Sequence, residues 1–206
     1  MKKALILVDI QNDFVTGGAL AVPEGETIVP TVNQLQEYFD LVVATQDWHP
    51  AEHGSFAANH EGTKPGEMID LNGLDQILWP VHCVQGTQGA EFVSELSMDK
   101  VKEVFVKGTD TEIDSYSGFF DNGKRKATGL GDYLKEQGIT DVYICGLATD
   151  YCVKFTALDA KELGFNTCLI KDASRGVNLS PGDVEKAIEA MAASGIHVIE
   201  SSTLLG

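Results

Sequence analysis

The sequence has few basic residues. Only 15 lysines and arginines oppose 31 aspartates and glutamates, which gives a formal net charge of −16 over 206 residues. So negative a chain repels nucleic acid and anionic membrane surfaces, and we expect neither as a partner. The sequence also lacks an apolar run long enough to cross a bilayer. Hydrophobic residues still make up 43% of the chain, enough for a real core. The length and composition fit one globular domain of ordinary size.

Cysteine is scarce, and none of it shows the C-x-x-C spacing of redox or zinc motifs. We therefore expect no disulfide framework and a reducing, cytoplasmic location. The N-terminus "MKKALILVDI" begins like a secretory signal, with two lysines before an apolar run. However, Asp9 interrupts that run and no small-residue cleavage site follows. We interpret this stretch as a buried strand.

Six short apolar runs rich in valine, isoleucine and leucine predict strands that are buried on both faces. They cover 4–10, 41–47, 103–108, 141–146, 166–173 and 197–201. Helical patterns alternate with them at 27–39, 129–138, 149–164 and 180–195, the third with Thr149 or Asp150 as its N-cap. This order predicts an α/β fold of three layers (αβα), with a six-stranded, mostly parallel sheet, Rossmann-like, in one domain over 1–206.

Residues 48–102 do not follow this alternation. The segment contains proline, glycine, histidine and tryptophan with little periodicity. A loop of this length in a compact domain is usually functional. We expect it to be an insertion that supplies a metal or substrate site.

Reactive side chains stand at the ends of the predicted strands. The first strand leads to Asp9, the second to Asp47, the third to Lys107, and the fourth continues through "GLATDY" to Cys152. Ligands of open parallel sheets bind beyond the carboxyl ends of the strands. The four side chains are therefore expected to meet at one edge.

Cys152 is the candidate nucleophile of this group. It falls in the first turn of a predicted helix, where the helix dipole and a nearby Lys107 favour a thiolate. Asp9 could accept the thiol proton. The alternative, an inert buried cysteine, suits Cys145 and Cys168 better because both lie inside predicted strands.

A second group of residues has the chemistry of metal ligands. Asp47 and His49 lie in "QDWHP", and His82 follows in "WPVHC". Two imidazoles and a carboxylate can hold a metal ion with open positions for water or substrate. The alternative is that such histidines cap loops or bind backbone carbonyls, which we expect of His53, His60 and His197.

Five motifs carry a family resemblance over nearly the whole chain. The stretches "VDIQNDF", "TQDWHP", "WPVHCVQGT", "VKGTDTEIDSYSGF" and "CGLATDYCV" resemble, in this order, the nicotinamidases of the isochorismatase-like cysteine hydrolases. The resemblance implies a six-stranded parallel sheet with flanking helices. It also implies hydrolysis of nicotinamide to nicotinate and ammonia through a cysteine thioester, in NAD salvage.

The resemblance also assigns roles to residues. It implies a catalytic triad and a metal site, with a cis peptide between Leu147 and Ala148 that forms an oxyanion hole. The implied triad is Asp9, Lys107 and Cys152; the metal ligands are Asp47, His49 and His82; the oxyanion-hole amides are those of Ala148 and Cys152; and the substrate pocket is lined by Phe14, Trp79, Tyr116 and Tyr151. One divalent ion is expected, zinc first, with iron and manganese as alternatives. Some relatives carry a different third or fourth ligand near the "DWHP" stretch, so the resemblance leaves His53 or Ser55 open as a further contributor, directly or through water.

Rival functions share the fold. Hydrolases of maleamate- or carbamoyl-type amides keep the triad but generally lack the metal cluster, and isochorismatases lack the cysteine nucleophile. A catalytically silent binding domain would not need the full triad. A hydrolase that uses metal-bound water would tolerate loss of Cys152. The sequence leaves the oligomeric state, monomer or homo-oligomer, undecided.

Overall fold

The computed structural model describes residues 2–206, and a single sheet dominates it. Its six parallel strands run in the order β5-β2-β1-β6-β7-β8. The strands are β1 (Lys2–Val8), β2 (Leu41–Asp47), β5 (Val101–Lys107), β6 (Ile139–Leu147), β7 (Asn166–Arg175) and β8 (His197–Ile199). All six predicted strands are therefore found, with ends shifted by a few residues.

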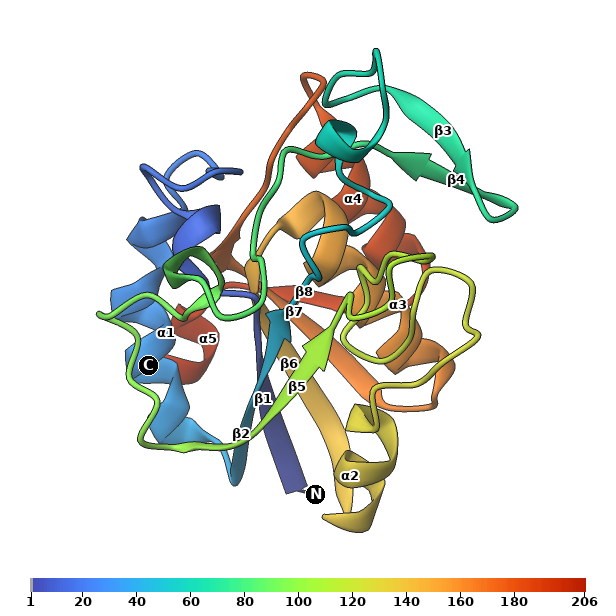
Figure 1. Ribbon diagram of the computed structural model, residues 1–206. Helices are drawn as coiled ribbons and strands as arrows, with labels where there is room; N and C mark the ends of the chain where they lie inside the picture. Colours follow the sequence, from blue (N-terminus) through green and yellow to red (C-terminus); the bar gives the residue numbers. More distant parts are fainter. Residues whose placement is uncertain (1) are drawn as a thin grey trace.

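Helices cover both faces of the sheet (Figure 1). On one face lie α1 (Val29–Leu35) and α5 (Ser202–Leu205); on the other lie α2 (Leu130–Glu136), α3 (Lys154–Glu162) and α4 (Asp183–Ala193). The three-layer αβα architecture is as predicted. None of the helices within residues 2–206 combines the length and the apolar character that a membrane span requires.

The central strand β1 explains why the apolar runs do not alternate. Its successive side chains enter two different cores, so every position is apolar. Ala4, Ile6 and Val8 pack with α2, α3 and α4, whereas Leu5 and Leu7 pack with α1. A strand buried on both faces needs this sequence.

The predicted N-cap of the helix after β6 needs correction. The turn before α3 is N-capped by Ala148 without a side-chain hydrogen bond, so neither Thr149 nor Asp150 is the cap. The Asp150 carboxylate instead accepts the backbone N–H groups of Val177 (2.9 Å) and Asn178 (2.7 Å). It ties the loop after β7 to the start of α3.

The segment 48–102 contains an antiparallel hairpin, β3 (Met68–Leu71) and β4 (Leu74–Ile77), which the sequence pattern did not predict. It projects from the body at the upper right of Figure 1. Two isolated bridges, His49 with Val84 and Phe56 with Trp79, join the two ends of the segment. These bridges bring His49 and His82 to the same place.

Candidate active site and metal centre

The strand-end residues meet where the strand order of the sheet reverses. β1 lies between β2 and β6. The next strand of this sheet after β2, β5, lies on the far side of β2, whereas β6 returns to the other side of β1. In parallel sheets such a switch point leaves a crevice at the carboxyl ends of the strands. Asp9 follows β1, Asp47 and Lys107 end the paired strands β2 and β5, and Cys152 follows β6.

Lys107 links the other three side chains. Its Nζ lies 2.8 Å from Asp9 Oδ2, 2.5 Å from Asp47 Oδ1 and 3.4 Å from Cys152 Sγ, and it donates to the Ser115 carbonyl at 2.9 Å. Burial would lower the pKa of this ammonium, but the Asp47 and Asp9 carboxylates raise it well above its ordinary value. Lys107 is therefore a permanent positive charge at the centre of the site.

Asp9 is completely buried and still able to accept a proton. Burial raises its pKa above the ordinary value of 3.8, against the opposing effect of Lys107. Its Oδ1 accepts a hydrogen bond of 2.6 Å from the Thr45 hydroxyl. A carboxylate with a raised pKa is a stronger base than an exposed one, which suits proton transfer from a neighbouring thiol.

Cys152 lies in a π-helical turn, Thr149–Val153, directly before α3. Burial raises the pKa of its thiol well above the ordinary value, and Lys107 only partly counters this. The lysine expected from the sequence is in contact with the sulfur at 3.4 Å, but burial opposes the thiolate more strongly than Lys107 favours it. The chemistry therefore needs a base that takes the thiol proton, and Asp9 is the candidate.

Two backbone amides lie beside the sulfur. The peptide bond between Leu147 and Ala148 is cis, as the resemblance implies. The Ala148 carbonyl accepts the N–H groups of Tyr151 and Val153, each at 3.1 Å. Outside the π-helical turn itself, no acceptor for the N–H groups of Ala148 and Cys152 is found within residues 2–206. Two donors are thus available for a negative oxygen.

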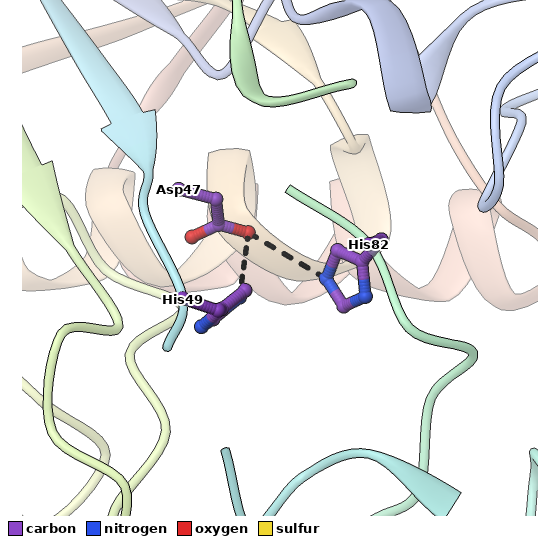
Figure 2. Close-up of side chains that lie close together, drawn as sticks. All are labelled: Asp47, His49 and His82. Atoms are coloured by element: carbon purple, nitrogen blue, oxygen red, sulfur yellow. Dashed lines mark ion pairs between the residues drawn. The ribbon is translucent and has the colours of Figure 1, made fainter. Parts of the chain in front are cut away.

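The metal-ligand candidates also lie together (Figure 2). The Oδ2 atom of Asp47 is 3.5 Å from His49 Nε2 and 3.9 Å from His82 Nε2. All three side chains are buried. One potential ligand atom from each lies within 4.8 Å of the others, which is a suitable arrangement for one ion.

Backbone carbonyls orient both imidazoles. His49 Nδ1 contacts the Gly108 carbonyl at 2.8 Å, and His82 Nδ1 contacts the Pro80 carbonyl at 2.7 Å. Such contacts leave Nε2 free for a metal and are typical of metal-binding histidines. Gly108 allows this approach, because its φ is +64° and a Cβ there would lie 2.3 Å from His49 Cε1.

The charges around the cluster also suit a cation. Burial lowers the pKa of His82 to about 4, which keeps this imidazole in the neutral form that binds metals. Burial lowers the pKa of His49 as well, but the Asp47 carboxylate outweighs this and raises it. Asp47 therefore attracts positive charge to this point, whether as a proton or as a metal ion.

Two further polar groups border the cluster. His49, His53 and Asp114 form a second buried trio whose ligand atoms lie within 4.8 Å of one another. His53 Nδ1 receives the Ser55 backbone N–H at 3.2 Å and lies 2.8 Å from the Ser55 hydroxyl, whereas its buried Nε2 has no partner within residues 2–206. The Ser55 hydroxyl is therefore engaged by His53, and His53 Nε2 is the atom of this pair that has no hydrogen-bond partner within residues 2–206.

Aromatic side chains enclose a small cavity of about 30 Å³ beside the sulfur. The lining includes Phe14, Trp79, Tyr116 and Tyr151, together with Asp47, His49, His82, Asp114 and Cys152. Trp79 meets Tyr151 edge-on, with ring centroids 4.8 Å apart. The nucleophile candidate Cys152, the three metal-ligand candidates and the four aromatic side chains therefore line the same cavity.

Sequence reasoning missed two buried polar residues that hold the site. Asp114 lines the cavity, and Gln11 forms three hydrogen bonds of 2.8 Å: to the backbone N–H and carbonyl of Asp47, and to the Ala90 carbonyl. Both lie inside the quoted motifs, "EIDSY" and "VDIQN". Their position inside these motifs is the sequence signal that could have identified Asp114 and Gln11 as site residues.

Comparison with known proteins gives consistent matches over the whole chain. The family model "Isochorismatase domain" matches residues 3–203. The nicotinamidase of Escherichia coli (strain K12) is 50% identical over 197 residues, which is 94% of this chain and 92% of that protein. The chain is therefore similar in both length and sequence to this curated enzyme.

Solved structures agree with this match. An Acinetobacter baumanii nicotinamidase/pyrazinamidase superposes with a TM-score of 0.96 at 49% identity, covering 99% of this chain and 98% of that one. A Pyrococcus horikoshii pyrazinamidase in complex with zinc superposes with a TM-score of 0.79 at 42% identity, covering 97% and 99%. On its sequence and its fold, this chain belongs to the isochorismatase family.

Proposed function

We propose that this chain is a nicotinamidase, an amide hydrolase that converts nicotinamide and water to nicotinate and ammonia through a thioester on Cys152. The whole chain acts as one domain, and its segment 48–102 supplies most of the metal and substrate side. The observation that carries the proposal is the position of Lys107. One ammonium contacts the thiol, the buried carboxylate of Asp9 and the metal-ligand candidate Asp47.

The first half-reaction forms the thioester. Asp9 takes the thiol proton as Cys152 Sγ bonds to the amide carbon. Lys107 stabilises the negative charge that moves from the carboxylate to the sulfur and on to the amide oxygen. The free N–H groups of Ala148 and Cys152 can bind that oxyanion, with about 3 kcal/mol for each donor in comparable sites. Asp9 then gives its proton to the amine as the C–N bond breaks and ammonia leaves.

The second half-reaction returns the enzyme to its starting state. Asp9, now a carboxylate again, accepts a proton from a water molecule as the water oxygen bonds to the thioester carbon. The C–S bond breaks and the sulfur regains a proton from Asp9. The carboxylic acid formed gives its proton to solvent or to the ammonia released earlier and leaves as nicotinate, so atoms and charges balance without any redox partner.

The residues present fit a divalent cation. Asp47, His49 and His82 would hold it, and zinc is our first choice, since two imidazoles and one carboxylate with open positions form a typical zinc site. When bound, such an ion would accept the pyridine nitrogen of the substrate and thereby fix the ring.

His53 borders the cluster through its Nε2 atom. Its Nδ1 lies 2.8 Å from the Ser55 hydroxyl and 3.2 Å from the Ser55 backbone nitrogen. The buried Nε2 has no hydrogen-bond partner within residues 2–206 and suits a contact with a group held at the cluster.

The reaction is tested by ammonia release from nicotinamide by metal-replete protein, compared with other amides of similar size. We expect nicotinamide to be turned over at least about tenfold faster than a maleamate- or carbamoyl-type amide, because only a heteroaromatic ring can use both the aromatic walls and the cation. Equal or better turnover of the other amides would contradict the assignment.

A further inference from the structure

The hairpin of β3 and β4 sends one polar side chain into the site. Along its two strands the other side chains are exposed or half-buried, and Gln76 alone is buried, with 3% of its surface exposed. A polar amide that enters the interior from a projecting hairpin must have partners there to offset its desolvation. Its partners therefore indicate what the hairpin does.

Gln76 joins two residues that line the catalytic cavity. Its Nε2 lies 2.7 Å from the Ile77 carbonyl, 3.1 Å from Asp114 Oδ2 and 3.1 Å from the Tyr116 hydroxyl. An amide nitrogen carries only two hydrogens. Since the shortest contact takes one, the other is shared between the Asp114 carboxylate and the Tyr116 phenol.

These contacts determine the orientation of the Tyr116 hydroxyl. Its oxygen accepts hydrogen bonds from Gln76 Nε2 and, at 3.1 Å, from Trp79 Nε1. Both lone pairs are then used, so the O–H hydrogen must point away from both donors. No acceptor for that hydrogen is found within residues 2–206, and Tyr116 lines the catalytic cavity.

We propose that Gln76 is a positioning residue for the substrate: together with Trp79 it turns the Tyr116 hydroxyl so that its hydrogen is donated to a molecule bound in the catalytic cavity. The inference rests on the proposed function and names a determinant of substrate binding outside the strand ends. Gln76 does not touch the sulfur, Asp9 or Lys107. Its loss should therefore weaken substrate binding and spare the chemical step.

The test compares two buried glutamines that receive the same substitution. Gln76→Met keeps the length of the side chain and removes the N–H donors. Gln36→Met is the control, because Gln36 is 2% exposed and donates to the Ser97 carbonyl at 3.0 Å, and neither residue lines the cavity. We expect Gln76→Met to raise KM for nicotinamide about tenfold while kcat changes by less than about twofold. Gln36→Met should lower thermal stability but leave both constants unchanged.

A double-mutant cycle separates positioning from simple loss of packing. Tyr116→Phe removes one oxygen atom and nothing else, and should raise KM by about the same factor as Gln76→Met. If Gln76 acts through this hydroxyl, the double variant should match Tyr116→Phe within about twofold. If the two effects on KM multiply instead, or if Gln76→Met changes KM no more than Gln36→Met does, the proposal is wrong.

Failure of the proposed function would look different. In that case the wild-type protein would release no ammonia from nicotinamide, and there would be no KM to compare. If the wild type turns over nicotinamide but Gln76→Met leaves KM unchanged, only the positioning role is contradicted.

Discussion

The two sides of the active site are built in different ways. On the sulfur side, Asp9, Lys107 and Cys152 lie at or just beyond the ends of strands of one sheet, and their positions depend on the hydrogen bonding between those strands. On the metal side, His49 and His82 lie in the long segment 48–102, and backbone carbonyls hold their rings. The only strand-end member of the metal side is Asp47.

This difference shows how one buried ammonium can serve both sides. Lys107 contacts Asp9 on the sulfur side and Asp47 on the metal side. The sulfur side should do the bond-breaking chemistry and the metal side should hold the substrate. If so, substitutions on the two sides will have separable effects, on kcat in one case and on KM and metal content in the other.

The largest effect is expected from Cys152→Ala. Without the sulfur no thioester forms, so turnover should fall by about a thousandfold or more, with metal content unchanged. Ammonia release and elemental analysis on the same sample measure both. Cys145→Ala is the matched control, because Cys145 is also buried but lies within β6. Appreciable turnover by Cys152→Ala, together with complete loss on chelation, would instead support metal-bound water as the nucleophile.

Asp9→Asn should have the next largest effect, a fall in kcat of about 10²–10⁴-fold, because the base is lost. The wild type should also show a characteristic pH profile. Asp9 accepts a proton only as a carboxylate, and burial raises its pKa above 3.8. Activity should be present above that raised pKa and should be lost as the pH falls through it.

The pH profile of kcat/KM checks this assignment. The acid limb should lie at higher pH than the titration of an exposed aspartate, and the residual activity of Asp9→Asn should lack that limb. A variant that keeps both its rate and the limb would remove Asp9 as the base.

His49→Ala should have the smallest effect on chemistry and the clearest effect on the metal. We expect metal affinity to fall at least about tenfold and KM for nicotinamide to rise, because one ligand of the proposed site is lost. Titration with zinc followed by elemental analysis measures the first effect, and steady-state kinetics the second. His197→Ala is the control, because His197 is exposed on the edge strand β8.

A wild-type protein without a stoichiometric ion would make the histidine cluster structural. A large fall in kcat at constant KM in His49→Ala would contradict the division of the site into two sides.

The strands were predictable because both faces of the sheet are covered. A residue such as Ile6 or Leu7 has an apolar neighbour whichever way it points, so the run is apolar throughout and easily recognised. The hairpin was not predictable, because its short strands are largely exposed and carry no periodic apolar signal. The prediction of the N-cap before α3 was wrong for another reason. The Asp150 carboxylate accepts the backbone N–H groups of Val177 and Asn178, and these tertiary contacts compete with capping of its own helix.

For the site, the sequence identified which residues had reactive chemistry, and the strand-end rule explained why Asp9, Lys107 and Cys152 should be neighbours. It did not predict how strongly burial opposes the thiolate. A helix N-terminus is visible in a sequence, whereas the desolvation that raises the pKa of Cys152 depends on the burial of the site by distant segments. The roles of Gln11, Gln76 and Asp114 were missed because their partners lie in other segments.

By itself, the sequence determined the parallel sheet, the residues at its carboxyl edge and the family resemblance, because these follow from local apolar patterns and short motifs. Only the tertiary structure decided how charge is distributed among Lys107, Asp9 and Asp47, which nitrogen of His53 is free, and where the Tyr116 hydroxyl points. Those properties arise from burial and from hydrogen bonds between distant segments, and neither is encoded in a local pattern.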